Sequence, residues 1–396
     1  MNRQPFQTPP KSWSPCLTPW LVRLWGPLRR RTLLRKLRLV LRAVENVAPV
    51  RQAIADGAGV LLTPNHSFHY DSYVMMEAAR ELGRPVHFMT AWQVFAMSGW
   101  FERWILRRHG CFSINRESND LGAYRTAVEI LSGSDYPLVI FPEGDIYHVN
   151  DRVMPFREGA AAMAMSAARK GRRRIVCVPV ALKCSYEQDP LPDLQKLMTR
   201  LEERLLLRPR PDLPLPERIY RFGGAVLALK ELEYLGESHT GPLPERIGQL
   251  AGHIIGGLEK AYHVTPRTKQ LPERVKELRR QVIQQQERDN LSDDERIRLE
   301  REMEDLFFAV QLLSYPGNYV SEKPTIERLA ETLDKFEEDV FRVAQPGVRG
   351  ARQVVVRFGD PIEVSKEREG RDAVTRFTDL LEGKVQELLN QISPAP

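Results

Sequence analysis

The central part of the chain alternates short β-branched apolar runs with stretches of helical periodicity. The apolar runs predict strands at 60–63, 86–90, 111–114, 138–141 and 175–182. The helical stretches predict helices at 71–82, 93–107, 121–131 and 158–169. Because strands that alternate with helices pair mainly in parallel, residues 53–186 are predicted to form an α/β core, a mostly parallel sheet flanked by helices. Residues 351–396 are predicted to complete this core with a final strand and a closing helix.

Residues 187–350 are rich in Leu, Glu, Arg and Gln and poor in strand formers, which predicts a large all-helical insertion before the last strand. The insertion contains a repeat, because Leu-Pro-Glu-Arg begins at positions 215, 243 and 271, at a constant interval of 28 residues. Proline suits the first turn of a helix and glutamate its positive end, so each copy predicts a helix start. Two more helices are predicted to open near Ser292 and Pro324. Chance recurrence of a common helix-start sequence is the alternative interpretation.

The amino-terminal segment, residues 1–52, has apolar residues at helical spacing between positions 17 and 47, with arginines between them. This pattern predicts a basic amphipathic helix, which Pro27 could break. One interpretation is a helix that lies in the headgroup layer of an anionic membrane. The other is an ordinary helix that packs its leucines on the core and exposes its basic face. Trp20 and Trp25 favour the membrane, because tryptophan is enriched at bilayer interfaces.

Positive charge is concentrated in this segment, which holds eleven basic residues and one acid, Glu45, and so carries +10. The whole chain carries +6, from 58 Lys and Arg against 52 Asp and Glu, which leaves −4 for the remainder. Because nucleic-acid binding requires a basic surface, the net negative body is not expected to have a nucleic-acid partner. An anionic membrane surface is the partner expected for the basic segment.

Four cysteines without paired spacing argue against zinc-finger and disulfide-scaffold classes and indicate a reducing compartment. The sequence has no uninterrupted apolar run near the ~18 residues that a membrane-spanning helix needs. Arginines interrupt any apolar core of a secretory signal at the amino terminus. The expected location is therefore cytoplasmic, peripheral on the cytoplasmic face of the membrane.

A functional site is predicted where the strand at 60–63 ends, because functional groups of α/β folds collect at the carboxyl ends of strands. His66 and Asp71 follow this strand. A regular helix would separate two residues at this spacing by about 140°, whereas a turn would bring them together. An aspartate bonded to one imidazole nitrogen leaves the other able to take a proton from a hydroxyl. A structural histidine held by aspartate is the commoner outcome of this pattern alone.

Three more strand ends carry distinctive blocks: residues 110–116 open with glycine and close on arginine, residues 141–145 read Phe-Pro-Glu-Gly-Asp, and residues 178–180 read Val-Pro-Val. Together with the segment from His66 to Asp71, and in this order, these blocks resemble the phospholipid/glycerol acyltransferase family. The resemblance implies an O-acyltransferase that moves a fatty acyl group from acyl-CoA or acyl carrier protein to the hydroxyl of a glycerolipid acceptor, such as 1-acylglycerol-3-phosphate. It implies no cofactor other than this acyl donor.

The resemblance also implies catalytic and binding roles for individual residues. His66 is the expected general base on the acceptor hydroxyl, and Asp71 is its orienting partner. Gly110 and Arg116 are expected to hold the phosphate of the acceptor, because arginine is the usual fork for a phosphate.

The block at residues 141–145 is expected to contribute two further binding residues. Glu143 is expected to accept hydrogen bonds from the glycerol hydroxyl or to fix Arg116, and Gly144 to let the backbone approach closely. Many relatives have threonine where this chain has Asp145. An anionic headgroup is less favoured beside that carboxylate, so an acceptor such as another lysolipid or an amino-lipid is the alternative within the same chemistry.

Two interpretations from other functional classes stay open. A metal-dependent hydrolase would use a ligand set drawn from His66, His69, Asp71, Glu143 and His148. That interpretation leaves the arginine block and the Val-Pro-Val block unexplained, so no metal site is predicted. A catalytically silent membrane scaffold would use the helical insertion for partners, although the presence of both His66 and Asp71 argues against it.

Overall fold

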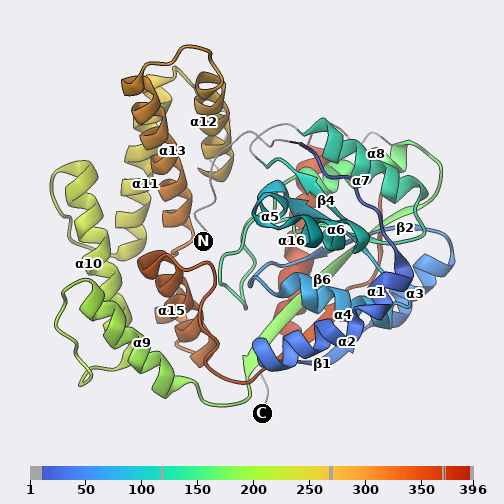
Figure 1. The fold of residues 1–396 in the computed structure, drawn as a ribbon, viewed down its shortest axis with the longest axis horizontal. Helices are drawn as coiled ribbons and strands as arrows, with labels where there is room; N and C mark the ends of the chain where they lie inside the picture. Colours follow the sequence, from blue (N-terminus) through green and yellow to red (C-terminus); the bar gives the residue numbers. More distant parts are fainter. Residues whose placement is uncertain (1–10, 117–119, 267–270, 368–369, 371, 393–396) are drawn as a thin grey trace. The chain divides into compact units, whose positions relative to one another are not determined.

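The computed structural model describes residues 11–116, 120–266, 271–367, 370 and 372–392. The first ten residues of the predicted basic segment and the last four of the chain lie outside this description. The described residues divide into two compact units. The helical unit spans Leu191–Pro346, and the α/β unit combines the chain before it with the chain after it. Figure 1 shows the helices of the first unit and the sheet of the second.

An eight-stranded sheet forms the centre of the α/β unit, with strands in the order β1-β7-β6-β2-β5-β3-β4 and β8 paired with β6. The strands are β1 (Leu39–Glu45), β2 (Gly59–Pro64), β3 (His87–Ala91), β4 (Cys111–Ile114), β5 (Leu138–Val139), β6 (Ile175–Tyr186), β7 (Arg352–Phe358) and β8 (Ile362–Glu363). Only the pairs β6–β7 and β6–β8 are antiparallel among the described strands. The predicted mixed α/β fold with a mostly parallel sheet is therefore confirmed.

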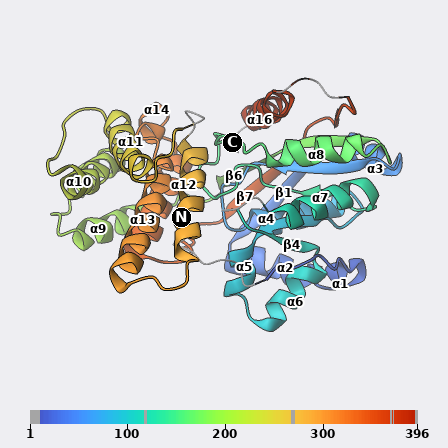
Figure 2. The same ribbon diagram turned by 90° about the horizontal axis from the view of Figure 1, so that it is seen from above.

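Helices cover both faces of this sheet, because successive strand residues point to opposite sides. On β2, Val60 and Leu62 join one apolar core and Leu61 joins the other. The first core contains side chains of α3 (Val47–Ala55), α4 (Asp71–Glu81) and α5 (Trp92–Met97). The second contains side chains of α7 (Leu121–Gly133), α8 (Gly159–Arg169) and α16 (Ala373–Gln391). Figure 2 shows α8 and α16 together on one side of the sheet.

The basic amphipathic helix predicted between positions 17 and 47, which Pro27 could break, is divided into shorter pieces and stops before position 39. The chain forms α1 (Pro19–Leu24), α2 (Gly26–Arg31) and a π-helical turn η1 (Thr32–Lys36), and then enters strand β1. Arg38 has a left-handed backbone (φ 48°), which ends the helical path. Strand β1 then pairs in parallel with β7, which comes more than 300 residues later in the sequence. Helical spacing alone did not reveal this long-range partner.

The helix predicted over 93–107 is divided in two. Helix α5 ends at Met97, and α6 (Trp100–Arg108) starts after the extended residues Ser98 and Gly99. Among the described residues, no helix combines the length and the apolarity needed to cross a membrane.

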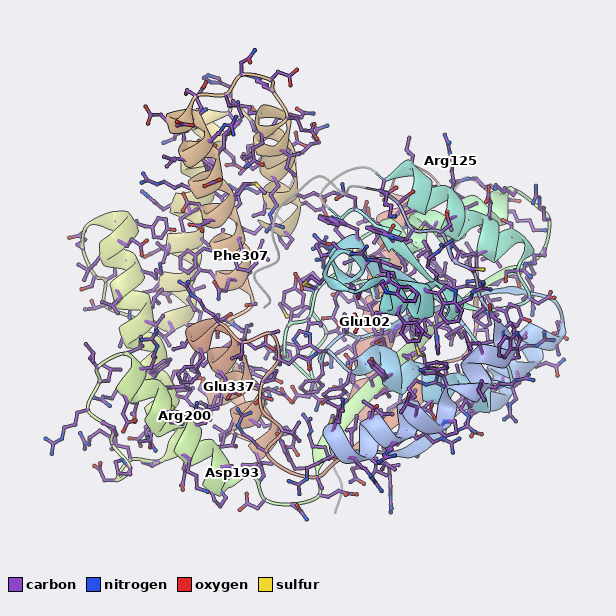
Figure 3. All side chains as sticks on the ribbon, in the orientation of Figure 1. Glu102, Arg125, Asp193, Arg200, Phe307 and Glu337 are labelled. Carbon is purple, nitrogen blue, oxygen red and sulfur yellow. The ribbon has the colours of Figure 1, made fainter. Side chains whose placement is uncertain are left out.

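The helical unit consists of α9 (Leu191–Arg204), α10 (Leu215–Leu235), α11 (Leu243–Ala261), α12 (Leu271–Gln286), α13 (Asp293–Leu313), α14 (Tyr319–Glu322) and α15 (Ile326–Phe341). The three copies of the repeat open α10, α11 and α12, as predicted. Ser292 caps α13 through its side chain, and Thr325 does the same for α15. Arg200, labelled in Figure 3, lies over the ring of Phe341 and joins α9 to the end of α15.

Each copy of the repeat performs the same packing task. Its arginine reaches a glutamate on the preceding helix, in the pairs Arg218–Glu202 (2.6 Å), Arg246–Glu231 (2.6 Å) and Arg274–Glu259 (2.7 Å). The last two pairs are bidentate, which matches the planar guanidinium to the carboxylate. The 28-residue interval is therefore the number of residues between one such arginine and the equivalent arginine of the next helix.

Candidate active site

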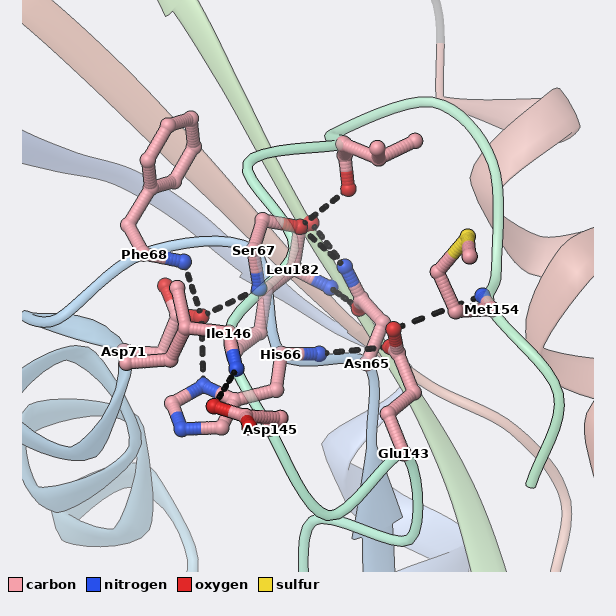
Figure 4. A network of polar contacts seen from close by, with 11 residues as sticks. Asn65, His66, Ser67, Phe68, Asp71, Glu143, Asp145, Ile146, Met154 and Leu182 are labelled. Carbon is pink, nitrogen blue, oxygen red and sulfur yellow. Dashed lines mark hydrogen bonds and ion pairs between the residues drawn. The ribbon is translucent and has the colours of Figure 1, made fainter. Parts of the chain in front are cut away.

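The candidate site lies where the loops that follow two paired parallel strands meet. Leu62 of β2 is paired with Val139 of β5, and the next residue, Ile140, donates its backbone N–H to the Leu62 carbonyl (3.1 Å). The two chains therefore leave the same edge of the sheet side by side. One continues into the loop of His66, and the other into the loop of Glu143. Figure 4 shows the polar contacts that join these loops.

A turn brings His66 and Asp71 together, as their spacing allowed. The imidazole Nδ1 lies 3.0 Å from Oδ2 of Asp71. The same carboxylate oxygen accepts the backbone N–H groups of Ser67 (2.7 Å) and Phe68 (2.8 Å). Asp71 is also the first residue of α4, so its negative charge sits at the positive end of a helix. Three hydrogen bonds and the helix end therefore fix this carboxylate.

The geometry prepares His66 for proton transfer at its other nitrogen. The bond to the Asp71 carboxylate assigns the Nδ1 position as a donor, which leaves a lone pair on Nε2 of the neutral ring. Nε2 makes no hydrogen bond to any described residue, and the side chain is 18% exposed while that of Asp71 is 4% exposed. The ring stacks on Phe141, with centroids 4.1 Å apart. His66 can thus accept a proton from a hydroxyl that approaches Nε2.

Glu143 fixes the backbone beside the histidine. Its Oε1 accepts the N–H of His66 (2.7 Å), and its Oε2 accepts the N–H of Met154 (3.3 Å). Burial raises the pKa of the Glu143 carboxyl well above its usual value, although these two N–H groups oppose the rise. Among the described residues, Glu143 does not bond to Arg116, which was one of its two expected roles. Glu143 instead ties the loop of His66 to the chain at Met154.

Arg116 reaches the loop after β5 through different partners. It donates from Nη1 to the carbonyl of Gly144 (2.5 Å) and lies 3.9 Å from the Asp145 carboxylate. Burial tends to raise the pKa of Asp145, but Arg116 and the Ile146 N–H outweigh it and hold that pKa below its usual value. Arg116 is therefore close to an anion of the protein itself, which a bound phosphate would have to displace or join.

Gly144 is needed in this loop for two reasons. Its φ of 74° lies in the left-handed region that favours glycine. A Cβ at this position would also lie 2.5 Å from Nε of Arg157, so any side chain would displace that arginine. The side chain of Arg157 thus occupies the space beside Gly144. Sequence reasoning did not single out Arg157, although its segment lies directly before α8.

Gly110 is not brought together with the other expected site residues. It precedes β4, whereas Arg116 follows the same strand. Its φ is 83°, and a Cβ there would lie 2.9 Å from the Val86 carbonyl. Gly110 therefore allows close packing at the amino end of β4. This is the opposite end of the parallel strands from His66.

Two asparagines that sequence reasoning missed hold the site against β6. Strand β2 ends opposite Val180, but β6 continues to Tyr186, so its later backbone groups need other partners. Asn65 accepts the N–H of Leu182 (2.8 Å) and donates to its carbonyl (3.0 Å). Asn150 does the same for Cys184 (2.8 and 2.6 Å). The only sequence signal was the position of Asn65 beside the histidine.

The five residues of the alternative metal site are divided between different contacts. His66 and Asp71 bond to each other, and both oxygens of Glu143 accept backbone N–H groups. The rings of His69 and His148 pack edge to face, with centroids 5.7 Å apart. The contacts of His66, Asp71 and Glu143 favour proton transfer at His66 over a metal ion shared by these three residues.

Comparison with known families assigns the segment that contains these loops. The family model described as Acyltransferase matches residues 42–183, from within β1 to within β6. The match includes the loops of His66, Arg116 and Glu143 and excludes the whole helical unit. No curated protein matches the chain.

Proposed function

We propose that this chain is an O-acyltransferase acting on a glycerolipid hydroxyl, because residues 42–183 match the family model described as Acyltransferase. The proposed donor is the thioester of acyl-CoA or acyl carrier protein, and the proposed acceptor is a lysolipid such as 1-acylglycerol-3-phosphate. The observation that carries the proposal is the His66–Asp71 pair, in which Asp71 holds Nδ1 and Nε2 stays available.

The proposed reaction transfers one proton out and back. The acceptor hydroxyl gives its proton to Nε2 of His66 while its oxygen attacks the thioester carbonyl carbon. Asp71 stabilises the imidazolium that forms. The tetrahedral intermediate then collapses, the C–S bond breaks, and His66 returns the proton to the leaving sulfur. The products are an ester and a free thiol, so atoms and charge balance without a cofactor.

The proposed acceptor site is the loop that Arg116 and Asp145 share. A phosphate would bind the Arg116 guanidinium and would compete there with the Asp145 carboxylate, which lies 3.9 Å away. This pairing supports a second candidate, an acceptor whose headgroup carries both a phosphate and an amine, or an amine alone. In that case Asp145 would bind the amine while Arg116 binds the anion.

We further propose that the basic amino-terminal segment docks this site on an anionic membrane leaflet, on the cytoplasmic face. Arg23, Arg31, Arg35 and Lys36 are exposed and form no ion pair with any described residue. Cations of this kind each add about 1 kcal/mol of attraction near an anionic surface. The lipid acceptor would then reach the enzyme from the bilayer.

The test is incubation of the purified protein with a panel of donors and acceptors, read by lipid mass spectrometry. The panel pairs acyl-CoA or acyl carrier protein with lysophosphatidate, glycerol 3-phosphate, a zwitterionic lysolipid and an amino-lipid. We expect one acceptor class to gain one acyl chain, and His66→Ala to abolish the product. Ester formation that is equal in the wild type and in His66→Ala would remove the general base from the proposal.

A further inference from the structure

Helix α6 presents three aromatic side chains to solvent. Trp100 is 81% exposed, Phe101 47% and Trp104 41%. At about 100° per residue, these three and the arginines at 107 and 108 fall within an arc of about 120° on the helix. We call Trp100, Phe101 and Trp104 the aromatic face. An ordinary core-packing helix buries its large apolar residues, whereas α6 has no buried residue at all.

The rings of the aromatic face are held in a defined arrangement. Phe101 stacks on Trp104, with centroids 5.9 Å apart, and meets Trp100 edge to face at 5.8 Å. The guanidinium of Arg108 lies 5.5 Å from the centre of the Trp104 ring. Glu102, labelled in Figure 3, is the single acid of α6 and caps its amino end at Gly99. The face itself is therefore apolar with a cationic end.

The aromatic face is continuous with the amino-terminal helices. The ring of Trp25 lies 6.5 Å from that of Phe101, and the backbone N–H of Thr18 bonds to the carbonyl of Arg108 (2.9 Å). On α1, Trp20 and Leu24 are one turn apart and about 65% exposed. Figure 2 shows α1, α2 and α6 on the same side of the sheet. Two segments far apart in sequence thus build one surface of exposed aromatic and apolar side chains.

We propose that the aromatic face inserts into the headgroup layer of an anionic bilayer, beside the basic amino-terminal segment. Large exposed apolar patches mark interaction surfaces, and tryptophan rings with flanking arginines suit the membrane interface. The exposed cations of α1, α2 and η1 make this side of the unit complementary to an anionic leaflet. The inference deepens the proposed function, because it names the surface that meets the lipid.

The test compares vesicle binding of two variants in the intact chain. The triple variant Trp100→Ser, Phe101→Ser, Trp104→Ser removes the aromatic face. The matched control, Leu121→Ser with Leu380→Ser, removes exposed leucines from α7 and α16 on the other side of the sheet. Co-sedimentation uses equimolar phosphatidylglycerol and phosphatidylcholine vesicles at low and high salt. We expect the triple variant to bind at least about 100-fold more weakly and the control to bind like the wild type.

Salt separates the aromatic face from the basic segment. Salt screens the attraction between exposed charges over about 8 to 10 Å at ordinary ionic strength. It does not weaken the contribution from burial of aromatic rings in the bilayer. Wild type should therefore keep a residual affinity at high salt that the triple variant loses. Turnover of a short, soluble acceptor should be equal in both proteins, so membrane binding and acyl transfer can fail separately. Unchanged vesicle binding by the triple variant would overturn the proposal. If sedimentation velocity showed in addition that the wild type is a dimer and the triple variant a monomer, the aromatic face would be a contact between two copies of the chain instead.

Discussion

Two hydrogen-bonded pairs of a basic and an acidic side chain, in different regions of the molecule, show how similar contacts serve different purposes. In the helical unit, Arg246 and Glu231 form two short bonds and are almost fully buried. At the strand ends of the α/β unit, His66 and Asp71 share one bond, and the histidine keeps a nitrogen without a described partner. A buried pair in which each side chain bonds to the other at two atoms holds structure. A pair with one open position at a partly exposed site can act on a substrate.

The two pairs also differ in what supports them. Glu231 is held by Arg246 and by the backbone N–H of His239. Asp71 is held by the amides of Ser67 and Phe68, and the loop of His66 is itself tied to Glu143. The hydrogen bonds at the site thus hold His66 with one nitrogen open to solvent. Those between the helices hold Glu231 and Arg246 against each other. The predictions below test this distinction.

The largest effect is expected at the base. His66→Ala should lower turnover by about 10² to 10⁴-fold, because the proton acceptor is lost, and should leave the melting temperature nearly unchanged. Asp71→Ala should also abolish transfer, whereas Asp71→Asn should be less severe because an amide oxygen still accepts the nearby N–H groups. Steady-state kinetics and thermal melting measure both effects. Residual turnover within a few-fold of wild type for His66→Ala would contradict the distinction drawn here.

The opposite pattern is expected in the helical unit. Glu231→Ala should destabilise that unit by about 3 to 5 kcal/mol, because Arg246 is left buried and uncompensated. Denaturant unfolding followed by circular dichroism measures the loss. Turnover of a soluble acceptor below the melting transition should be unchanged. The control is Glu231→Leu with Arg246→Met, which removes both charges and should recover most of the lost stability.

A smaller effect is expected at the acceptor site. Arg116→Ala should raise the KM for a phosphorylated acceptor by about 10-fold, because a charged hydrogen bond is lost. Arg116→Lys should recover only part, since a point charge lacks the planar fork. Asp145→Asn should lower the same KM, because the competing carboxylate is removed. Equal kinetics for Arg116→Lys and wild type would show that the fork is not needed.

A comparable effect on a different kinetic constant is expected from Glu143→Gln. The amide nitrogen of glutamine would face an N–H donor, so either His66 or Met154 loses its acceptor. Turnover should fall by about 10-fold while the KM for the acceptor changes little, because the base is misplaced and the phosphate contact is intact. A raised KM with unchanged kcat would instead place Glu143 at the acceptor.

The smallest effect is a difference in pH dependence between the two regions. The hydrogen bonds from Arg246 lower the pKa of Glu231, so its contribution to stability is full above about pH 4.5 and is lost as pH falls through the lowered pKa. Burial raises the pKa of Glu143, so its carboxyl favours the fold at low pH, and this contribution is lost as pH rises through the raised pKa. The free energy of unfolding, measured against pH, should lose the first trend in Glu231→Gln and the second in Glu143→Gln. Parallel profiles would contradict the assignment.

The sequence indicated much of the site because its motifs are local. The turn that joins His66 to Asp71 is closed by residues between them, so spacing and residue type were sufficient to propose the pair. The helix starts of the 28-residue repeat were predictable for the same reason. Gly110 was grouped with Arg116 because they lie in one block, but a strand between them carries them to opposite edges of the sheet.

The sequence by itself determined the α/β alternation, the helical insertion and the identity of the candidate base, because each rests on contacts between residues close in the chain. The tertiary structure decided that residues 39–45 are a strand, since their hydrogen-bond partners on β7 come more than 300 residues later. It also decided the tasks of Glu143 and Asn65, whose acceptors and donors bind backbone groups of distant segments. Local patterns encode local geometry, whereas long-range pairing depends on which chain segments the folded sheet places side by side.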